Sequence, residues 1–356
     1  MASVFLFSNK NPMEILIGLL IIAVGAFCQS SCYVPINKIK DWSWESYWLV
    51  QGVFAWLVLP LLGALLAVPA GHSICELFAS ANSFNIGMTI LFGVLWGVGG
   101  LTFGLSMRYL GVALGQSIAL GTCAGLGTIL GPVLLNIFFP EEDALSRLTF
   151  AVILGVAVTL LGIAIIGVAG KMKSDGLSEE EKKKAVKDFN FPKGITIALL
   201  AGFMSGCFNV GLEFGKDVNF GDLTPDMFKT LPATLLVTLG GFVTNAVYCL
   251  WQNQKNHTWA DYKKGNVWLN NLVFCLLAGA LWYSQFFGLA LGKGFLTTSP
   301  TLMTLSFCIL MALNVVFSNV WGIILKEWVG CNRKTIAMLI VGIVVLIFAT
   351  FLPQLI

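Results

Sequence analysis

The chain has 356 residues, of which 57% are hydrophobic and 11% are charged, and its formal net charge is +3. Soluble domains carry about 25% charged residues because their surface faces water, so this composition excludes a soluble globular protein. The mean hydropathy of +0.85 and the long apolar runs indicate an all-α integral membrane protein. No basic tract suggests binding to nucleic acid.

Apolar segments long enough to cross a bilayer as helices recur along the whole chain. Ten transmembrane helices are expected, at residues 13–35, 46–69, 84–108, 112–139, 147–169, 193–213, 230–252, 267–291, 296–325 and 334–355. The first is interpreted as a retained span, because no small-residue cleavage site follows it. The hydrophilic stretch 170–192 is interpreted as a linker between an amino-terminal five-helix unit, 1–169, and a carboxy-terminal five-helix unit, 193–356.

The distribution of Lys and Arg predicts the orientation of the spans. Sixteen of the 21 Lys and Arg residues lie in or beside the loops that follow the odd-numbered spans. The other five are Lys10, Arg147, Lys216, Lys229 and Lys293. Because positive residues accumulate in cytoplasmic loops, the linker is expected in the cytoplasm and both termini outside.

An internal repeat relates the two units at a constant shift of 186 residues. The matched pairs are Gly93 and Gly279, Trp96 and Trp282, Leu105 and Leu291, and Arg147 and Arg333. Paired Trp, Gly and Arg residues at one offset indicate a duplication. Since five spans is an odd number, the second copy must enter the membrane in the opposite sense. Two inverted repeats with a site at their interface are typical of secondary transporters.

Four stretches carry a more specific pattern. They are Tyr33–Lys38 running into Trp42–Glu45, then Met107–Gly111, Trp282–Phe287 and Leu325–Trp328. Together they resemble the bacterial L-rhamnose–proton symporter family of the drug/metabolite transporter superfamily, over nearly the whole chain. The resemblance implies the drug/metabolite transporter fold, and import of L-rhamnose or a related 6-deoxyhexose with protons across the bacterial inner membrane. Another sugar or small polar metabolite, sodium coupling and export remain open as alternatives.

A sugar site within a bilayer needs neutral hydrogen-bonding groups for the hydroxyls and an aromatic face for the C–H side of the ring. Polar residues in the spans are the candidates, because they usually face the bundle interior. The predicted substrate-binding residues are Gln29, Tyr33, Trp96, Gln116, Asn209, Asn245, Trp282, Tyr283, Gln285 and Asn314. The alternative is that the amides hydrogen-bond one helix to another and that the two tryptophans are packing residues.

Proton coupling requires a titratable group that can be reached from both sides. Both histidines lie in loops, and Glu14 at the start of the first span can reach the surface, so Glu213 is predicted to couple protons. An ion pair of Glu213 with Lys216 is the alternative. The predicted gate or helix-end anchors are Arg108, Lys326 and Glu327.

Other functional classes are not favoured by the sequence. An enzyme would need a catalytic constellation, and the sequence has no His-rich box, metal-ligand cluster or Ser-His pairing, so neither a metal nor a cofactor is expected. A channel would need a filter-like segment and oligomeric symmetry. The twofold repeat within one chain instead favours a carrier that functions as a monomer, with a sugar, protons or sodium, and the lipid bilayer as its partners.

Overall fold

The computed structural model describes residues 12–110, 112–176, 191–324, 326 and 328–355. Within these residues the chain is helical and has no strand, and ten helices are long and apolar enough to cross a membrane. They span Pro12–Ile36, Trp44–Leu65, Ser83–Ser106, Ile118–Phe138, Phe150–Lys173, Pro192–Phe214, Asp226–Asn256, Gly265–Gly294, Pro300–Ile324 and Arg333–Gln354. The ten predicted spans are therefore confirmed, with differences of a few residues at their ends.

The first two crossings are each built from more than one helical element. Helices α1 (Pro12–Ser31) and α2 (Tyr33–Ile36) form the first, and α3 (Trp44–Gly52), η1 (Val53–Val58) and α4 (Leu59–Leu65) form the second. The other crossings are α6 (Ser83–Leu110), α7 (Val112–Phe138), α8 (Phe150–Asp175), α10 (Phe191–Phe214), α11 (Leu231–Asn256), α12 (Gly265–Gly294), α13 (Pro300–Ile324) and α14 (Arg333–Phe351). A short helix that hydropathy does not predict, α5 (Ile74–Ser80), begins with a capping box formed by Ser73 and Glu76.

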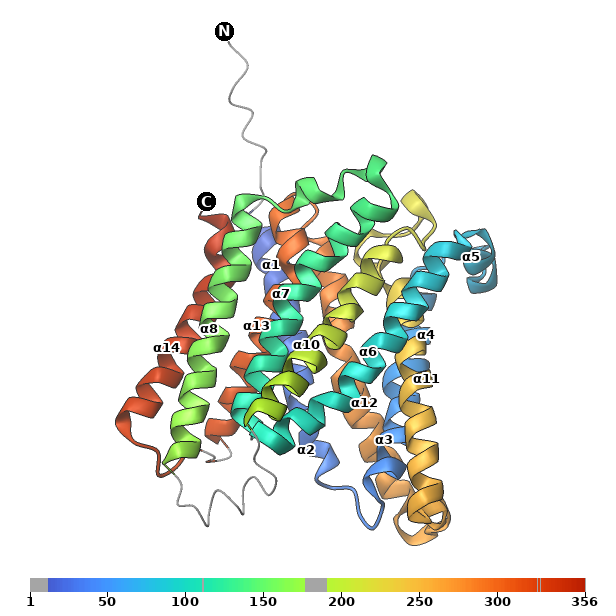
Figure 1. The fold of residues 1–356 in the computed structure, drawn as a ribbon. Helices are drawn as coiled ribbons and strands as arrows, with labels where there is room; N and C mark the ends of the chain where they lie inside the picture. Colours follow the sequence, from blue (N-terminus) through green and yellow to red (C-terminus); the bar gives the residue numbers. More distant parts are fainter. Residues whose placement is uncertain (1–11, 111, 177–190, 325, 327, 356) are drawn as a thin grey trace.

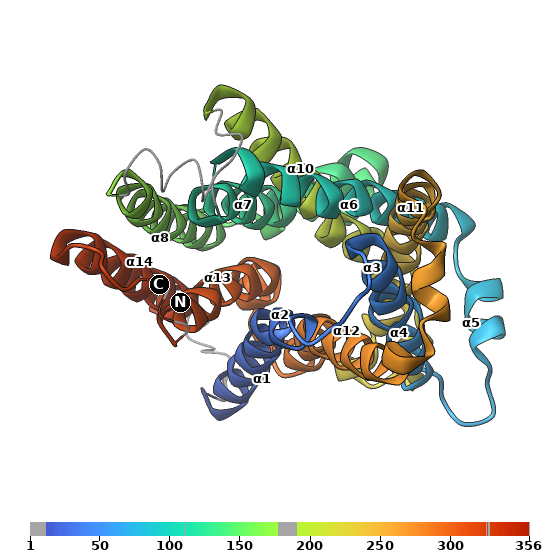
Figure 2. The same cartoon turned by 90° about the horizontal axis from the view of Figure 1, so that it is seen from below.

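The helices run up and down through one bundle (Figure 1). We call the face at which α1 begins and α14 ends the upper face, and the opposite face the lower face. Seen from below, α8 and α14 lie side by side at one end of the bundle, while α3, α4, α11 and α12 gather at the other end (Figure 2).

The neighbours of each helix follow a twofold pattern. Helix α1 packs against α12 and α13, and its counterpart five crossings later, α10, packs against α6 and α7, which are the counterparts of α12 and α13. Helices α8 and α14, which are counterparts of each other, also pack together. Each helix and its counterpart thus pack against corresponding helices of the opposite unit, which is compatible with the predicted inverted repeat.

Two glycines matched by the repeat lie at equivalent close approaches between helices. A Cβ at Gly93 would collide with the carbonyl oxygen of Val237, and a Cβ at Gly279 would lie 3.2 Å from the carbonyl oxygen of Gln51. Gln51 and Val237 are themselves 186 residues apart. The local packing of these helices is therefore compatible with the repeat that the sequence predicts.

A π-helical stretch, η1, interrupts the second crossing. Its wider turn changes the direction of the side chains that follow, and such stretches are frequent at functional sites. Gly52 lies directly against the indole of Trp56, where a Cβ would collide with the ring. The wide turn and the missing side chain together let Trp56 point into the bundle, where it is 4% exposed.

Candidate functional site

A central cavity of about 140 Å³ lies within the bundle and is lined by residues of α1, α2, α3, η1, α6, α7, α10, α11, α12 and α13. Seven of the predicted substrate-binding residues line it: Gln29, Tyr33, Trp96, Asn245, Trp282, Gln285 and Asn314. Cavities for drug-sized ligands measure about 300–1,000 Å³, so this cavity suits a smaller solute. Seven of the ten predicted positions are thus brought together around one cavity.

Four tryptophans form the aromatic wall of the central cavity. Trp56 makes edge-to-face contacts with Trp48, Trp96 and Trp282, with ring centroids 5.7, 6.0 and 5.9 Å apart. Trp96 and Trp282, the pair matched by the repeat, lie 5.6 Å apart. Edge-to-face pairs at these distances are favourable, so the four rings fix one another in place.

The amides of the central cavity are held in defined orientations. Asn245 accepts a hydrogen bond from Trp48 Nε1 at 3.0 Å and donates to the carbonyl of Gly241 at 2.9 Å. Gln285 donates to the carbonyl of Trp282 at 3.2 Å, and its Oε1 accepts from Asn314 Nδ2 at 3.0 Å. These hydrogen bonds fix the orientation of each amide group. They also determine which of its atoms remain available to a ligand.

Two buried polar atoms of this cavity have no hydrogen-bond partner among the described residues. They are Asn314 Oδ1, an acceptor, and Trp56 Nε1, a donor. A buried polar group without a partner costs about 1–3 kcal/mol. A ligand hydroxyl both donates and accepts, so it can satisfy either atom.

Two predicted residues lie outside the central cavity. Tyr283 is one position beyond Trp282 on α12, so its side chain points away from the cavity and its hydroxyl is buried against Gly63 of α4. Asn209 donates a hydrogen bond to the carbonyl of Gly127 at 2.8 Å and thereby joins α10 to α7. Helix register turns both side chains to neighbouring helices and not to the central cavity, and their predicted role in substrate binding stays a prediction.

The described residues do not include all of the predicted positions. The side chains of Gln116 and Arg108 and the whole of Glu327 lie outside them. Lys326 is exposed at the lower end of α13, with a left-handed backbone angle φ of 61°. Its position is that of a helix end, as the sequence indicates.

A second cavity, of about 310 Å³, lies at the upper ends of α7, α10, α12 and α13, and we call it the upper cavity. It is lined by Thr128, Pro132, Arg147, Glu213, Lys293, Thr297, Pro300, Met303 and Thr304. Glu213 pairs with Arg147, with Oε2 and Nη1 3.1 Å apart. The alternative pairing of Glu213 with Lys216 is wrong, because Lys216 pairs with Glu142.

An aromatic layer lies between the two cavities. The rings of Phe208 on α10 and Phe286 on α12 stack with centroids 3.8 Å apart, and both line the upper side of the central cavity. Phe307 on α13 lies beside them and lines the same cavity. All three side chains are at most 4% exposed.

On the opposite side of the cavity, Tyr33 at the lower end of the first crossing is 52% exposed. Tyr33 is thus both a lining residue of the central cavity and an exposed residue.

Known proteins resemble this chain over nearly its whole length. Residues 11–355 match the family model of the L-rhamnose-proton symport protein (RhaT). The chain belongs to this symporter family. Proteins named L-rhamnose-proton symporter from Yersinia pestis (strain Pestoides F) and Yersinia pseudotuberculosis serotype O:1b (strain IP 31758) are each 31% identical to it over 350 residues, which cover 94% of this chain and 96% of each relative. The resemblance inferred from the sequence is confirmed, and the chain is a transporter and not an enzyme.

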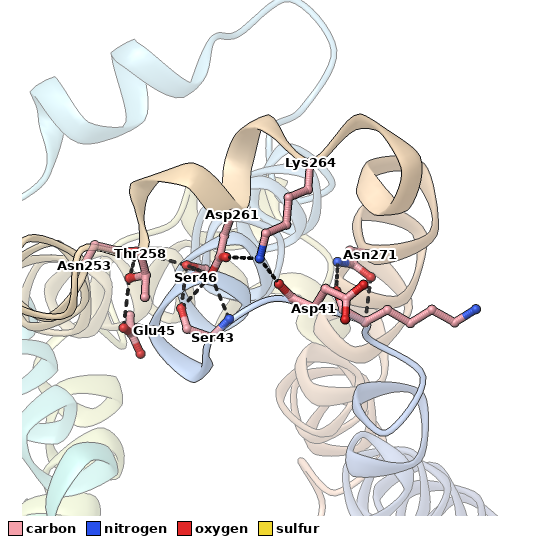
Figure 3. A network of polar contacts seen from close by, with 10 residues as sticks. Asp41, Ser43, Glu45, Ser46, Asn253, Thr258, Asp261, Lys264 and Asn271 are labelled. Carbon is pink, nitrogen blue, oxygen red and sulfur yellow. Dashed lines mark hydrogen bonds and ion pairs between the residues drawn. The ribbon is translucent and has the colours of Figure 1, made fainter.

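In this symporter-family chain, a polar network joins two loops at the lower face (Figure 3). Asp261 accepts hydrogen bonds from the amide and hydroxyl of Ser43, at 2.7 and 2.8 Å, and from the hydroxyl of Ser46 at 2.9 Å. Lys264 donates to the other carboxylate oxygen at 2.7 Å. Because Ser43 precedes α3, the carboxylate also lies at the positive end of that helix dipole. The network therefore fixes the start of the second crossing to the loop between α11 and α12.

The network predicts how the stability of this symporter-family chain depends on pH. Burial alone would raise the pKa of Asp261, but the bonds from Lys264, Ser43 and Ser46 outweigh burial and lower it to about 2. The pKa of an aspartate in the unfolded chain is about 3.9. The difference between the unfolded and folded pKa of Asp261 therefore contributes roughly 2 kcal/mol to the free energy of unfolding above pH ~4. A depressed pKa gives stability that is lost as the pH falls toward the folded value. Asp261→Asn is therefore expected to lower stability at pH 7 by about 2 kcal/mol.

The measurement is thermal unfolding in detergent at pH 7 and at stepwise lower pH. The difference between the wild type and Asp261→Asn should shrink below about pH 4. Asp226→Asn is the matched control, since Asp226 pairs with Lys229 but is 54% exposed, and exposed pairs contribute about 0–1 kcal/mol. An Asp261→Asn protein as stable as this control at pH 7 would contradict the role of the network.

Proposed function

We propose that this chain imports L-rhamnose, or a related 6-deoxyhexose, together with protons by alternating access. The observation that carries the proposal is the central cavity. It combines four tryptophans with two unpartnered polar atoms in a chain of the L-rhamnose-proton symport protein family. The relatives named above as L-rhamnose-proton symporters supply the sugar class.

The cavity suggests how a sugar would be held. The indoles of Trp96 and Trp282 cover the C–H face of the ring, Asn314 Oδ1 accepts a hydrogen bond from one hydroxyl, and Trp56 Nε1 donates to another. Gln29 and Tyr33, four residues apart on the first crossing, supply further polar groups from the lower side. A site with few, fixed polar groups and a large aromatic surface recognises the positions of hydroxyls more strictly than the presence of a methyl group.

The proposed orientation places the lower face in the cytoplasm and both termini outside, in the inner membrane of a bacterium. The concentration of Lys and Arg in the loops of the lower face supports it. We also propose that the two five-helix units are inverted repeats and that a monomer is functional. The twofold pattern of helix neighbours and the location of the central cavity within one chain support this proposal.

Proton coupling is proposed to take place in the upper cavity and to require Glu213. This carboxylate pairs with a permanent cation, Arg147, and lines the same cavity as Lys293. On the same helix α10, Phe208 lines the central cavity. A change in the charge of the upper cavity is thus transmitted along α10 to the sugar site.

The test is transport by the purified chain in proteoliposomes. Labelled L-rhamnose should exchange by counterflow, and an inward proton gradient should drive its accumulation. An inward gradient of about one pH unit should give about tenfold accumulation at one proton per sugar, because a factor of ten in either concentration has the same free energy. Absence of L-rhamnose exchange, alongside exchange of another sugar or metabolite, would replace the substrate in this proposal. Accumulation driven by a sodium gradient alone would replace the proton.

A further inference from the structure

The upper cavity contains two cations but one carboxylate. Glu213 Oε2 lies 3.1 Å from Arg147 Nη1, and the guanidinium therefore holds this carboxylate. Lys293 lines the same cavity from α12. Among the residues that the structure describes, no hydrogen bond or ion pair to the Lys293 ammonium is found. Within the described residues, the ammonium of Lys293 is thus the charged group of this cavity that no carboxylate contacts at ion-pair distance.

The other charged groups around Lys293 have partners of their own or face solvent. Glu142 lies 3.8 Å from Arg147 and is paired with Lys216. Asp226 belongs to the short helix that packs on the end of α12, and it pairs with Lys229 at 2.6 Å. Glu14 lies on α1, which also packs on α12, and it is exposed. No second carboxylate within the described part of the chain is therefore committed to Lys293.

The three charged groups of the cavity differ in their ability to exchange a proton. The guanidinium of Arg147 stays protonated in proteins. The carboxylate of Glu213 is already engaged by that guanidinium at hydrogen-bond distance. The amine of Lys293 is a compact group that gains and loses a proton without a large change of shape. Lys293 is therefore the group whose protonation changes the charge of the cavity without first breaking the pair between Arg147 and Glu213.

We propose that Lys293 takes up and releases the coupled proton, with Glu213 and Arg147 as positioning residues. This inference rests on the proposed function as a proton symporter. The bond that forms is N–H on the neutral amine, and it breaks when the same proton leaves, so no other reactant is needed. The buried hydroxyl of Thr128 lines the cavity and has no partner among the described residues. It can accept a hydrogen bond from the protonated amine or from a water that carries the proton.

The geometry also suggests how proton and sugar are coupled. A protonated Lys293 competes with Arg147 for the carboxylate of Glu213 and so weakens the tie between α10 and the segment before α8. Helices α7, α10 and α13 each line both cavities. Asn209 of α10 also bonds Gly127 of α7 between them. Protonation of Lys293 then favours an open upper cavity. A bound sugar supplies the contacts for closure, so protons do not cross the membrane without sugar.

The test compares exchange with accumulation in proteoliposomes. Lys293→Met removes the proton site, whereas Lys293→Arg replaces it with a permanent cation. Both variants should lose pH-driven accumulation of L-rhamnose, by about tenfold at a gradient of one unit, and L-rhamnose-dependent alkalinisation outside the vesicles. Counterflow, which needs no net proton movement, should fall by less than about threefold in Lys293→Met, so the two activities separate. Lys229→Met, at a paired lysine of the upper face, is the control and should keep both activities.

Each outcome bears on one proposal. Accumulation by Lys293→Met at the wild-type level, with proton uptake, would overturn the role of Lys293. Equal loss of counterflow and accumulation in both Lys293 variants, with normal behaviour in gel filtration, would overturn it as well, because the residue would then serve sugar movement itself. A wild-type chain that exchanges L-rhamnose without any response to pH would overturn the proposed proton symport instead.

Discussion

Replacing Asn314 with leucine is expected to lower kcat/KM for L-rhamnose uptake about 100-fold, which corresponds to about 3 kcal/mol of lost transition-state stabilisation. The change removes two interactions. It deletes the unpartnered acceptor Oδ1 that we propose for a sugar hydroxyl. It also deletes the Nδ2 donor that orients Gln285 at 3.0 Å, and so leaves a second buried polar atom without a partner. Leucine has a similar volume, so the helix packing is retained.

The measurement is the initial rate of labelled L-rhamnose uptake as a function of concentration. Asn319→Leu is the matched control on the same helix, since its side chain bonds the carbonyl of Val315 within α13 at 2.9 Å and does not line the central cavity. This control should change kcat/KM by less than about threefold. Equal effects of the two substitutions would show that the loss reflects α13 and not the sugar site.

Gly93→Ala is expected to destabilise the folded protein by more than about 2 kcal/mol, which is a large effect for one added methyl group. A Cβ at this position would collide with the backbone of Val237, and backbone cannot move aside as a flexible side chain can. Helices α6 and α11 would have to separate. Because Trp96 lies one turn further along α6, the aromatic wall of the central cavity would shift as well.

A second glycine of α6 gives a control, because its substitution by alanine should not lower the stability of the folded protein. A Cβ at Gly104 would meet no atom within 4 Å, so Gly104→Ala adds helix propensity without a collision. It should be neutral or stabilising by up to about 1 kcal/mol. Thermal unfolding of both variants in detergent separates the two cases. Similar unfolding temperatures for Gly93→Ala and Gly104→Ala would contradict the close approach of α6 and α11.

Much of the fold was predictable because the bilayer imposes a strong constraint. A helix satisfies its backbone hydrogen bonds within one segment of about 20 residues, so the apolar length of a segment identifies each of the ten spans. Asn245, Gln285 and Asn314 were found for a related reason, since an amide within a span has to be directed inward. Trp96 and Trp282 were found through the repeat, and they meet at 5.6 Å.

What the sequence missed depends on helix register and on helix-to-helix packing. Trp56 carries no polar signal, and it enters the cavity through the π-helical turn of η1, which hydropathy does not reveal. Trp48 of the same crossing was missed as well, and its ring contacts Trp56 with centroids 5.7 Å apart. The position of Tyr283 outside the central cavity was not predictable, because a family motif does not show on which side of α12 each of its residues lies. The pairing of Arg147 with Glu213 could not be predicted either, because it depends on the path of the segment before α8.

The network around Asp261 also has a consequence for biosynthesis. Its carboxylate bonds Ser43, 218 positions earlier in the chain, so the ribosome completes six further spans before this bond can form. Helix α1 likewise enters the bilayer before its neighbour α12 has been translated. The early spans must therefore remain inserted with their polar groups provisionally satisfied, by the translocon or by one another, until the later half of the nascent chain arrives. In a chain truncated after the fifth span, these early spans would lack the later helices against which they pack.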